Sequence, residues 1–265
     1  MAGYENGVIT EERLSDALHR ILALKAHMGL HRKAKNEIVP PVEVMEQTVG
    51  CEEHKAMAKE ISDKAITLVK YKDEDVLPML PDRYKRIMIV SVGGLSAGVM
   101  GTMMAKFMGG GKKSPAERLR DKLIEKGFDA FIYESPLDVM KKQIEAGEKP
   151  NLNLYFAGKN AIADFVKDMD LVITLCDVPS GRPSFGLSKG GGEIPWYVFE
   201  LPVIVVGTGQ PFVLADIPQA RTYINTYDSD DQTFDALIEK LMTGKAAFKG
   251  EDPVDAYCGL WDTHR

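Results

Sequence analysis

Short apolar runs alternate with helical stretches from about residue 65 to residue 245, and this alternation constrains the fold more than any other feature. We expect strands at residues 66–69, 86–92, 130–133, 171–176, 203–206 and 222–225. We expect helices at residues 115–126, 136–146, 161–167 and 234–242. Runs such as 87–90 and 203–206 are apolar throughout, which is typical of strands covered on both faces. The sequence therefore predicts an α/β fold: a three-layer α/β/α sandwich on a mostly parallel, doubly wound sheet.

Helices are predicted before the sandwich. Thr10 is suited to cap a first helix and Gly29 to end it. One apolar stripe recurs along this helix at helical spacing, formed by Leu14, Leu18, Ile21, Leu22 and Met28. A polar linker with two prolines follows, and then a helix over residues 42–64. We divide the chain into a helical segment (1–36), a linker and helix (37–64), the sandwich (65–245) and a C-terminal tail (246–265).

Charge and composition exclude several partners. Lys and Arg number 33 against 39 Asp and Glu, and this net charge of −6 disfavours nucleic-acid binding, which needs a basic surface. No apolar run reaches the roughly 18 residues of a membrane-spanning helix, and no secretion signal opens the chain. The three cysteines are far apart and form no Cys-x-x-Cys pair, so we expect reduced thiols, no metal site and a cytoplasmic protein.

A first candidate binding loop follows the strand expected at 86–92. Ser114, Pro115 and Glu117 fit a capping box with proline at the first helical position. Lys112 and Lys113 precede this helix near the positive end of its dipole, which suits an anion or a polar ligand. An exposed loop with an ordinary cap is the alternative.

A second candidate loop, residues 177–195, follows the strand expected at 171–176. Trp196 and Tyr197 come directly after it, and polar groups beside aromatic rings are typical of sugar sites, although the same two residues suit the start of a buried helix. Ligands of open α/β sheets gather at the carboxyl ends of strands. The two loops together give a candidate ligand site of six residues: Lys112, Lys113, Ser114, Arg182, Lys189 and Glu193.

Catalytic and cofactor motifs are absent from the sequence. The five histidines, at positions 19, 27, 31, 54 and 264, avoid the strand-end loops, which disfavours a Ser-His-Asp site or a histidine-ligated metal. Glu134, Asp177 and Asp228 lie near strand ends, where turn acids are common. The glycines match neither a dinucleotide fingerprint nor a P-loop, so a nucleotide- or flavin-binding protein is the least favoured alternative. We expect no cofactor.

Several segments resemble glycoside hydrolase family 3. Residues 20–30 resemble the final helix of that family's catalytic barrel, and residues 65–70, with Leu77-Pro78 and Arg86-Ile87, resemble the beginning of its second, α/β domain. Residues 222–227 and 248–254 resemble the end of its β-N-acetylhexosaminidase branch. The resemblance runs in order along nearly the whole chain.

This resemblance implies a C-terminal α/β domain, with residues 1–36 as a remnant of the helix that closes the barrel. In the family the nucleophilic aspartate, and in this branch the acid/base histidine, belong to the barrel, so neither role falls on a residue of this sequence. We therefore expect a non-catalytic domain, inactive alone, whose partner is the barrel of an enzyme that hydrolyses β-linked N-acetylglucosaminides. An autonomous carbohydrate- or anion-binding module remains the alternative, and self-association through the first helix is a further expectation.

Overall fold

The computed structural model describes residues 2–72, 75–93, 113–133, 143–144, 146–147, 149, 168–178 and 200–255. The chain divides into two compact units, Met1–Ala56 and Met57–Arg265. Within the described ranges, no helix combines the length and the apolar character that crossing a bilayer requires.

The first unit is helical. Its elements are α1 (Ala2–Glu5), α2 (Glu11–His27), α3 (Lys35–Ile38), α4 (Val42–Thr48) and the start of α5 (Glu52–Ala65). The prediction for α2 is confirmed at both ends. The Thr10 hydroxyl oxygen accepts a 3.2 Å hydrogen bond from the Arg13 N–H, and Gly29 follows the helix with a φ of 69°. That left-handed conformation suits glycine and ends the helix.

Two details of the N-terminal prediction are wrong. The single helix expected over residues 42–64 is two helices, because Gly50 adopts a φ of 73° between α4 and α5. The expected linker also contains the start of α3, where the Glu37 carboxylate accepts a 2.6 Å hydrogen bond from the Ala34 N–H. A carboxylate in this position accepts a hydrogen bond from a backbone N–H that has no partner within the helix. The spacing of apolar residues does not reveal this helix start.

The apolar stripe of α2 is not covered within the first unit. Leu14, Leu18, Ile21 and Leu22 are each at least 40% exposed. Their spacing of three and four residues places them on one face of the helix. A contiguous apolar face of this kind suits a contact with a partner.

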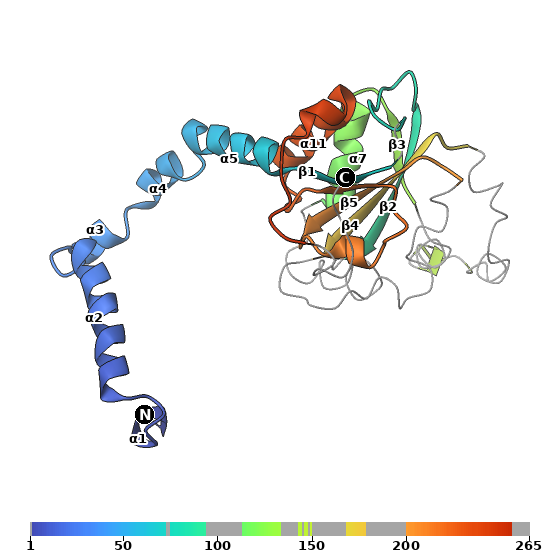
Figure 1. Cartoon of the computed structure of the whole chain (residues 1–265). Helices are drawn as coiled ribbons and strands as arrows, with labels where there is room; N and C mark the ends of the chain where they lie inside the picture. Colours follow the sequence, from blue (N-terminus) through green and yellow to red (C-terminus); the bar gives the residue numbers. More distant parts are fainter. Residues whose placement is uncertain are drawn as a thin grey trace. The chain divides into compact units, whose positions relative to one another are not determined.

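The second unit is built on a six-stranded sheet with the strand order β1-β6-β5-β4-β2-β3 (Figure 1). The strands are β1 (Thr67–Tyr71), β2 (Arg86–Gly93), β3 (Asp129–Ile132), β4 (Leu171–Val178), β5 (Val203–Gly209) and β6 (Thr222–Asn225). All six lie where the sequence predicts them, with small differences at the ends. β1 is antiparallel to β6 and all other neighbours are parallel, which confirms the mostly parallel α/β fold.

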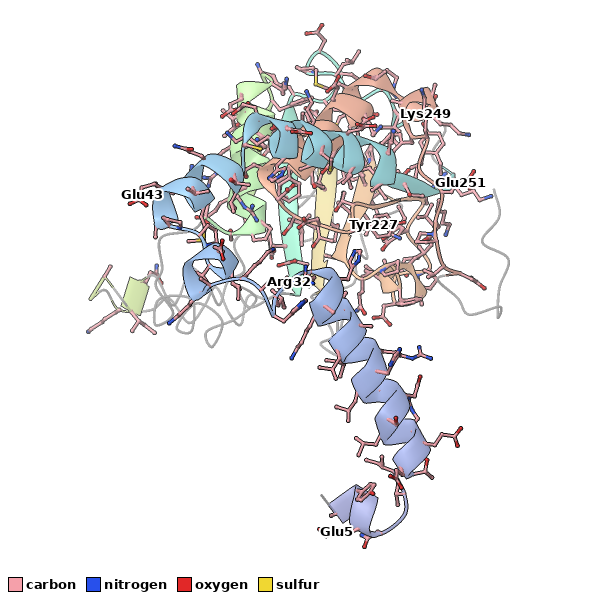
Figure 2. All side chains as sticks on the ribbon, turned by 90° about the vertical axis from the view of Figure 1, so that its left-hand side faces the viewer. Glu5, Arg32, Glu43, Tyr227, Lys249 and Glu251 are labelled. Atoms are coloured by element: carbon pink, nitrogen blue, oxygen red, sulfur yellow. The ribbon has the colours of Figure 1, made fainter. Side chains whose placement is uncertain are left out.

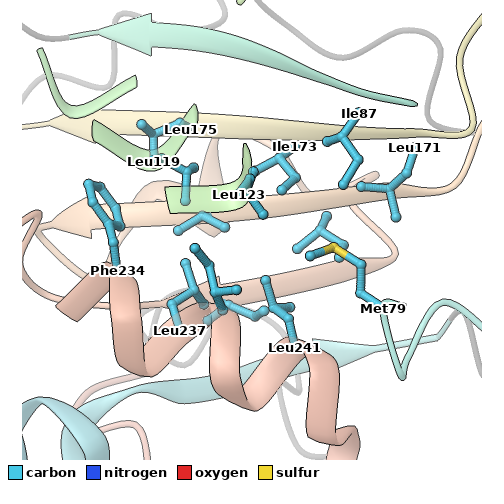
Figure 3. Packing of buried hydrophobic residues seen from close by; sticks show 14 of the residues in the cluster. Met79, Ile87, Leu119, Leu123, Leu171, Ile173, Leu175, Phe234, Leu237 and Leu241 are labelled. Atoms are coloured by element: carbon cyan, nitrogen blue, oxygen red, sulfur yellow. The ribbon is translucent and has the colours of Figure 1, made fainter. Parts of the chain in front are cut away.

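Helices α7 (Pro115–Glu125) and α11 (Asp231–Thr243) lie side by side on one face of the sheet (Figure 1). Leu119 and Leu123 of α7 and Phe234 and Leu237 of α11 pack on strand residues such as Ile173, and all five are fully buried (Figure 3). Burying a side chain of this size contributes about 1.5–3 kcal/mol. This core fixes both helices on the sheet.

The opposite face of the sheet carries a second core. Val172, Val203 and Val205 pack there with Leu214 and Ile217, from the stretch that contains the 3₁₀ helix η2 (Val213–Ala215). The helix predicted at 161–167, and most of the one predicted at 136–146, lie outside the described residues. In the described part, the α-helices that pack on the sheet are therefore those of the first face.

Candidate functional site

The carboxyl ends of four parallel strands meet at one edge of the sheet, here called the carboxyl edge. β2 ends at Gly93, β4 at Val178, β5 at Gly209 and β6 at Asn225, and Gly93 pairs with Asp177. Open α/β sheets bind ligands at this edge, between two neighbouring parallel strands whose following connections lead to opposite sides of the sheet. Here that point lies between β2 and β4, because the chain passes from β2 outward to β3 and from β4 the other way to β5. The carboxyl edge is the candidate site.

Both loops of the predicted ligand site leave from these two neighbouring strands. One loop connects β2 to α7, and the other follows β4. Outside the described residues lie Lys112, Arg182, Lys189, Glu193, Trp196 and Tyr197. The sheet order thus brings together the strands from which the loops leave, while the joint site of six residues stays a prediction.

Lys113 and Ser114 lie in the described part, and both contact residues of α7. Lys113 Nζ is 2.6 Å from Asp121 Oδ2. The Glu117 N–H donates to the Ser114 hydroxyl oxygen at 3.3 Å, and the Ser114 N–H donates to Glu117 Oε2 at 2.7 Å, which confirms the capping box. This backbone hydrogen bond lowers the pKa of Glu117. An external anion would therefore compete with the Glu117 carboxylate for the helix N-terminus.

Two of the three carboxylates noted near strand ends have partners close by. The Thr208 hydroxyl donates a 2.8 Å hydrogen bond to Asp177 Oδ1, which links β5 to β4. Asp228 Oδ1 accepts a 2.6 Å hydrogen bond from the Ser229 N–H, an ordinary turn contact. Glu134 lies outside the described residues. These contacts fit structural roles for Asp177 and Asp228.

A buried polar pair lies at the end of β6. The Tyr223 hydroxyl donates a 2.7 Å hydrogen bond to Asn225 Oδ1, and the Asn225 amide donates to the Pro211 carbonyl at 3.4 Å. Burial raises the pKa of the Tyr223 phenol well above its usual range, so the phenol stays neutral. A Cβ at Gly207 would lie 2.3 Å from the Tyr223 hydroxyl oxygen, so glycine is required there. The pair is a packed part of the core and does not offer its polar atoms to a ligand.

The direction of β1 brings the beginning of the sandwich to the same edge. Because β1 is antiparallel, its first residue, Thr67, pairs with Asn225, the last residue of β6. The Tyr227 hydroxyl lies 3.3 Å from Thr67 Oγ1 and 3.3 Å from Asp252 Oδ1. Burial raises the pKa of both Tyr227 and Asp252. The carboxyl edge therefore joins the sandwich to the segment that precedes it.

Metal ligands do not cluster among the described residues, where no three His, Cys, Asp or Glu side chains come together. Four of the histidines, His19, His27, His31 and His54, belong to the first unit, and His264 lies outside the described part. Cys176 is buried in the second core. The described side chains thus give no metal centre to which a reaction could be assigned.

Sequence reasoning missed the contact among Thr67, Tyr227 and Asp252. Thr67 and Tyr227 are 160 residues apart, and their proximity follows from the direction of β1, which apolar periodicity does not encode. The family resemblance was a signal near this contact, because Thr67, Tyr227 and Asp252 lie in three of the segments that carry it: residues 65–70, 222–227 and 248–254.

Known proteins resemble this chain over nearly its full length. No family model matches it. A β-N-acetylglucosaminidase/β-glucosidase of Cellulomonas fimi is 33% identical over 268 residues, which cover 99% of this chain and 42% of that enzyme. The solved structure of the β-glucoside phosphorylase BglX is 31% identical with a TM-score of 0.67, and the match covers 99% of this chain and 42% of the phosphorylase. The same phosphorylase bound to 2FGlc matches with a TM-score of 0.68.

The match to the phosphorylase agrees with the fold. The chain spans about two fifths of the length of the relatives it matches, 42% of the Cellulomonas fimi enzyme and 41–42% of the phosphorylase. The structural match covers 98% of this chain, which includes the six-stranded, mostly parallel sheet. The chain belongs to glycoside hydrolase family 3, where it matches the C-terminal part of the β-N-acetylglucosaminidase/β-glucosidase enzymes.

Proposed function

We propose that this chain supplies the α/β domain of an enzyme acting on β-linked N-acetylglucosaminides or β-glucosides, whose reacting groups belong to the rest of that enzyme. The observation that carries the proposal is the match to the Cellulomonas fimi enzyme over 99% of this chain and 42% of that enzyme. The contacts at the carboxyl edge support a structural role, since Asp177 bonds Thr208 and Asn225 bonds Tyr223.

The carboxyl edge is the side of the domain that we assign to the catalytic part. The chain begins the sandwich at this edge, and the loops after β2 and β4 leave from it. Whatever precedes β1 is therefore attached at the edge from which both loops leave. This arrangement supports a role for the loops beside the catalytic part or its substrate.

A binding module is the second candidate, and one observation favours it. β2 and β4 are neighbours at the point where strand order reverses, which is the preferred ligand position of open α/β sheets. Lys112, Lys113, Arg182 and Lys189 would supply charge-assisted hydrogen bonds to an anionic or acetamido-bearing saccharide. The competing contacts of Lys113 with Asp121 and of Ser114 with Glu117 weaken this candidate.

The apolar stripe of α2 supports a partner surface. Leu14, Leu18, Ile21 and Leu22 are uncovered within their own unit. In the intact enzyme we assign this face to the catalytic part. In the isolated chain the same face would pair with a second copy, because association removes apolar area from water.

A chimera tests the main proposal. The 268-residue matching stretch of the Cellulomonas fimi enzyme is replaced by this chain, and release of nitrophenol from aryl β-glucoside and aryl N-acetyl-β-glucosaminide is measured. We expect turnover within about tenfold of the parent enzyme, a difference of about 1.4 kcal/mol in barrier. The parent with the stretch deleted and this chain alone serve as controls and should both be inactive. The relatives' names include a glucosidase and a phosphorylase, so each assay is run with and without inorganic phosphate.

Two results would overturn the proposal. One is a chimera that is folded, as judged by circular dichroism and sedimentation, yet turns over neither substrate. The other is turnover by this chain alone that persists through repurification, because the reacting groups would then belong to the α/β domain.

A further inference from the structure

We propose that residues 245–252, here called the C-terminal strap, lock the last turn of α5 and the start of β1 onto the sandwich. The strap would thereby fix the direction in which the chain begins this domain. Three separate contacts converge on residues 63–67 and carry this inference. They involve Lys240 of α11, Gly250 of the strap, and the pair of Tyr227 and Asp252.

Lys240 joins three segments through one ammonium group. Its side chain is 6% exposed, and Nζ lies 2.8 Å from Asp63 Oδ1 in α5 and 2.8 Å from the carbonyl oxygen of Ala247 in the strap. A buried ammonium needs such partners, since leaving it unpaired is strongly unfavourable. The Ser62 and Thr233 hydroxyl oxygens, 3.1 Å apart, add a second link between α5 and α11. The last turn of α5 is thus held by α11 and, through Lys240, connected to the strap.

Gly250 holds the strap close to the backbone at the α5–β1 junction. A Cβ at this position would lie 2.6 Å from the Ile66 carbonyl oxygen and 2.9 Å from that of Ala65. It would also lie 2.7 Å from Thr67 Oγ1. Two of these three atoms are backbone atoms, one of buried Ile66 and one of half-buried Ala65, and they cannot turn aside as a flexible side chain would. The approach of strap and junction therefore depends on glycine.

Tyr227 links the end of the strap to the first residue of β1. Its hydroxyl is 3.3 Å from both Thr67 Oγ1 and Asp252 Oδ1. Thr67 donates its own proton to the Ala65 carbonyl at 2.8 Å, so the Thr67 oxygen is available to accept. The phenol proton of Tyr227 is thus shared between the strand and the strap. Phe248, which is 7% exposed, anchors the same segment in the first core.

β1 depends on such a lock because it is an edge strand. In the described part of the chain it pairs with β6 alone, and its register shifts between Leu68 and Lys70. Edge elements with few backbone partners open locally at low free energy. The strap contacts restrain the residues where this strand begins. The last turn of α5 directly precedes these residues, so its position is restrained as well.

The strap supplies its own matched controls. Lys249 and Glu251 flank Gly250, and both are exposed, with side chains at the margin of the domain in Figure 2. Substituting them changes the strap sequence without touching the three contacts. The test variants are Gly250→Ala and Lys240→Met, and the controls are Lys249→Ala and Glu251→Ala.

Hydrogen exchange measured by mass spectrometry tests the proposal on the full chain. We expect amides of residues 57–71 and 245–252 to exchange at least about tenfold faster in Gly250→Ala and Lys240→Met. Amides of β4 and β5 should stay within about twofold of the unaltered chain, and both controls should match it throughout.

Three outcomes would overturn the proposal. In the first, residues 57–71 exchange at the original rate in both test variants. In the second, β4 and β5 lose protection to the same degree as residues 57–71, so that the contacts belong to the global core. In the third, the exposed controls behave like the test variants. Should one test variant fail to fold, Tyr227→Phe removes the shared proton without adding volume, and the same criteria apply to it.

Discussion

The hydroxyl of Thr208 lies 2.8 Å from Oδ1 of Asp177 and ties the carboxyl end of β5 to that of β4. The Thr208 side chain is buried and that of Asp177 is half-buried. We expect Thr208→Val to lower the free energy of unfolding by about 1 kcal/mol, because the carboxylate loses a donor. Thr208→Ser keeps the hydroxyl and is the control. Urea denaturation measures both, and equal midpoints for the two variants would contradict the prediction.

Gly207 and Tyr223 should be energetically coupled. Gly207→Ala places a methyl group 2.3 Å from the Tyr223 hydroxyl oxygen, and we expect this overpacking to cost about 1–3 kcal/mol of stability. Tyr223→Phe removes that oxygen, so the double variant should lose less than the sum of the single losses, by about 0.5–3 kcal/mol. Strictly additive losses in a double-mutant cycle would show that the two positions do not meet.

Asp252 should make stability depend on pH. Its pKa in the folded chain is raised, chiefly by burial, so the folded state holds the proton more tightly than the unfolded state does. This group therefore contributes stability below the unfolded pKa of about 4, and the contribution is lost as pH rises through the folded pKa.

The comparison with Asp252→Asn isolates this contribution. We expect the stability of the unaltered chain, relative to the variant, to fall as pH rises from about 3.5 toward neutrality. Urea titrations at successive pH values measure the difference, with Glu251→Gln as the exposed neighbour control. A relative gain in stability as pH rises would contradict the prediction.

The predicted ligand site can be tested at its described end. Millimolar N-acetylglucosamine or a muropeptide should shift the amide signals of residues 112–114 and 182–193 together. Because Asp121 holds Lys113 at 2.6 Å, Asp121→Asn should free this lysine and strengthen the shifts. The triple substitution of Lys112, Lys113 and Arg182 by alanine should abolish them. If no signal in either loop moves, the six-residue site does not exist.

The stripe on α2 should cause self-association of the isolated chain. Leu18→Glu and Ile21→Glu place charges on this face, and Ala23→Glu places one on the opposite side of the helix as a control. We expect sedimentation to show dimers at high micromolar concentration for the unaltered chain and for Ala23→Glu. The two stripe variants should sediment as monomers, since burying an unpaired carboxylate is costly. Monomers throughout would contradict the prediction.

Local patterns made much of the fold predictable. Apolar runs marked all six strands, Thr10 and Gly29 marked α2, and the spacing of Ser114 and Glu117 marked the start of α7. Each of these signals lies within a few residues of the structure that it specifies. The break of the expected helix at Gly50 was missed because isolated glycines are tolerated inside helices.

The remaining features depend on contacts between distant segments. The reversed direction of β1 was not predictable, since a buried strand has the same composition in either direction. Lys113 looked available for an anion in the sequence, whereas its partner Asp121 lies on the following helix, eight residues further on. At the candidate site, the partner of Ser114 was therefore predictable from its local capping box, whereas the partner of Lys113 was not.

The contact of Gly250 with the carbonyl oxygens of Ala65 and Ile66 has a consequence for how this domain can be moved between proteins. It places the first backbone segment of the sandwich beside residue 250 of the C-terminal tail, so the two ends of the domain with its tail lie side by side. A domain whose two ends are adjacent tolerates insertion into a loop of a host protein and circular permutation. A short linker from residue 252 to residue 65 should close the sandwich into a permuted form with new termini in a surface connection. Two neighbouring attachment points on a host protein would be enough to hold such a domain, which makes it suited to transfer as an inserted cassette.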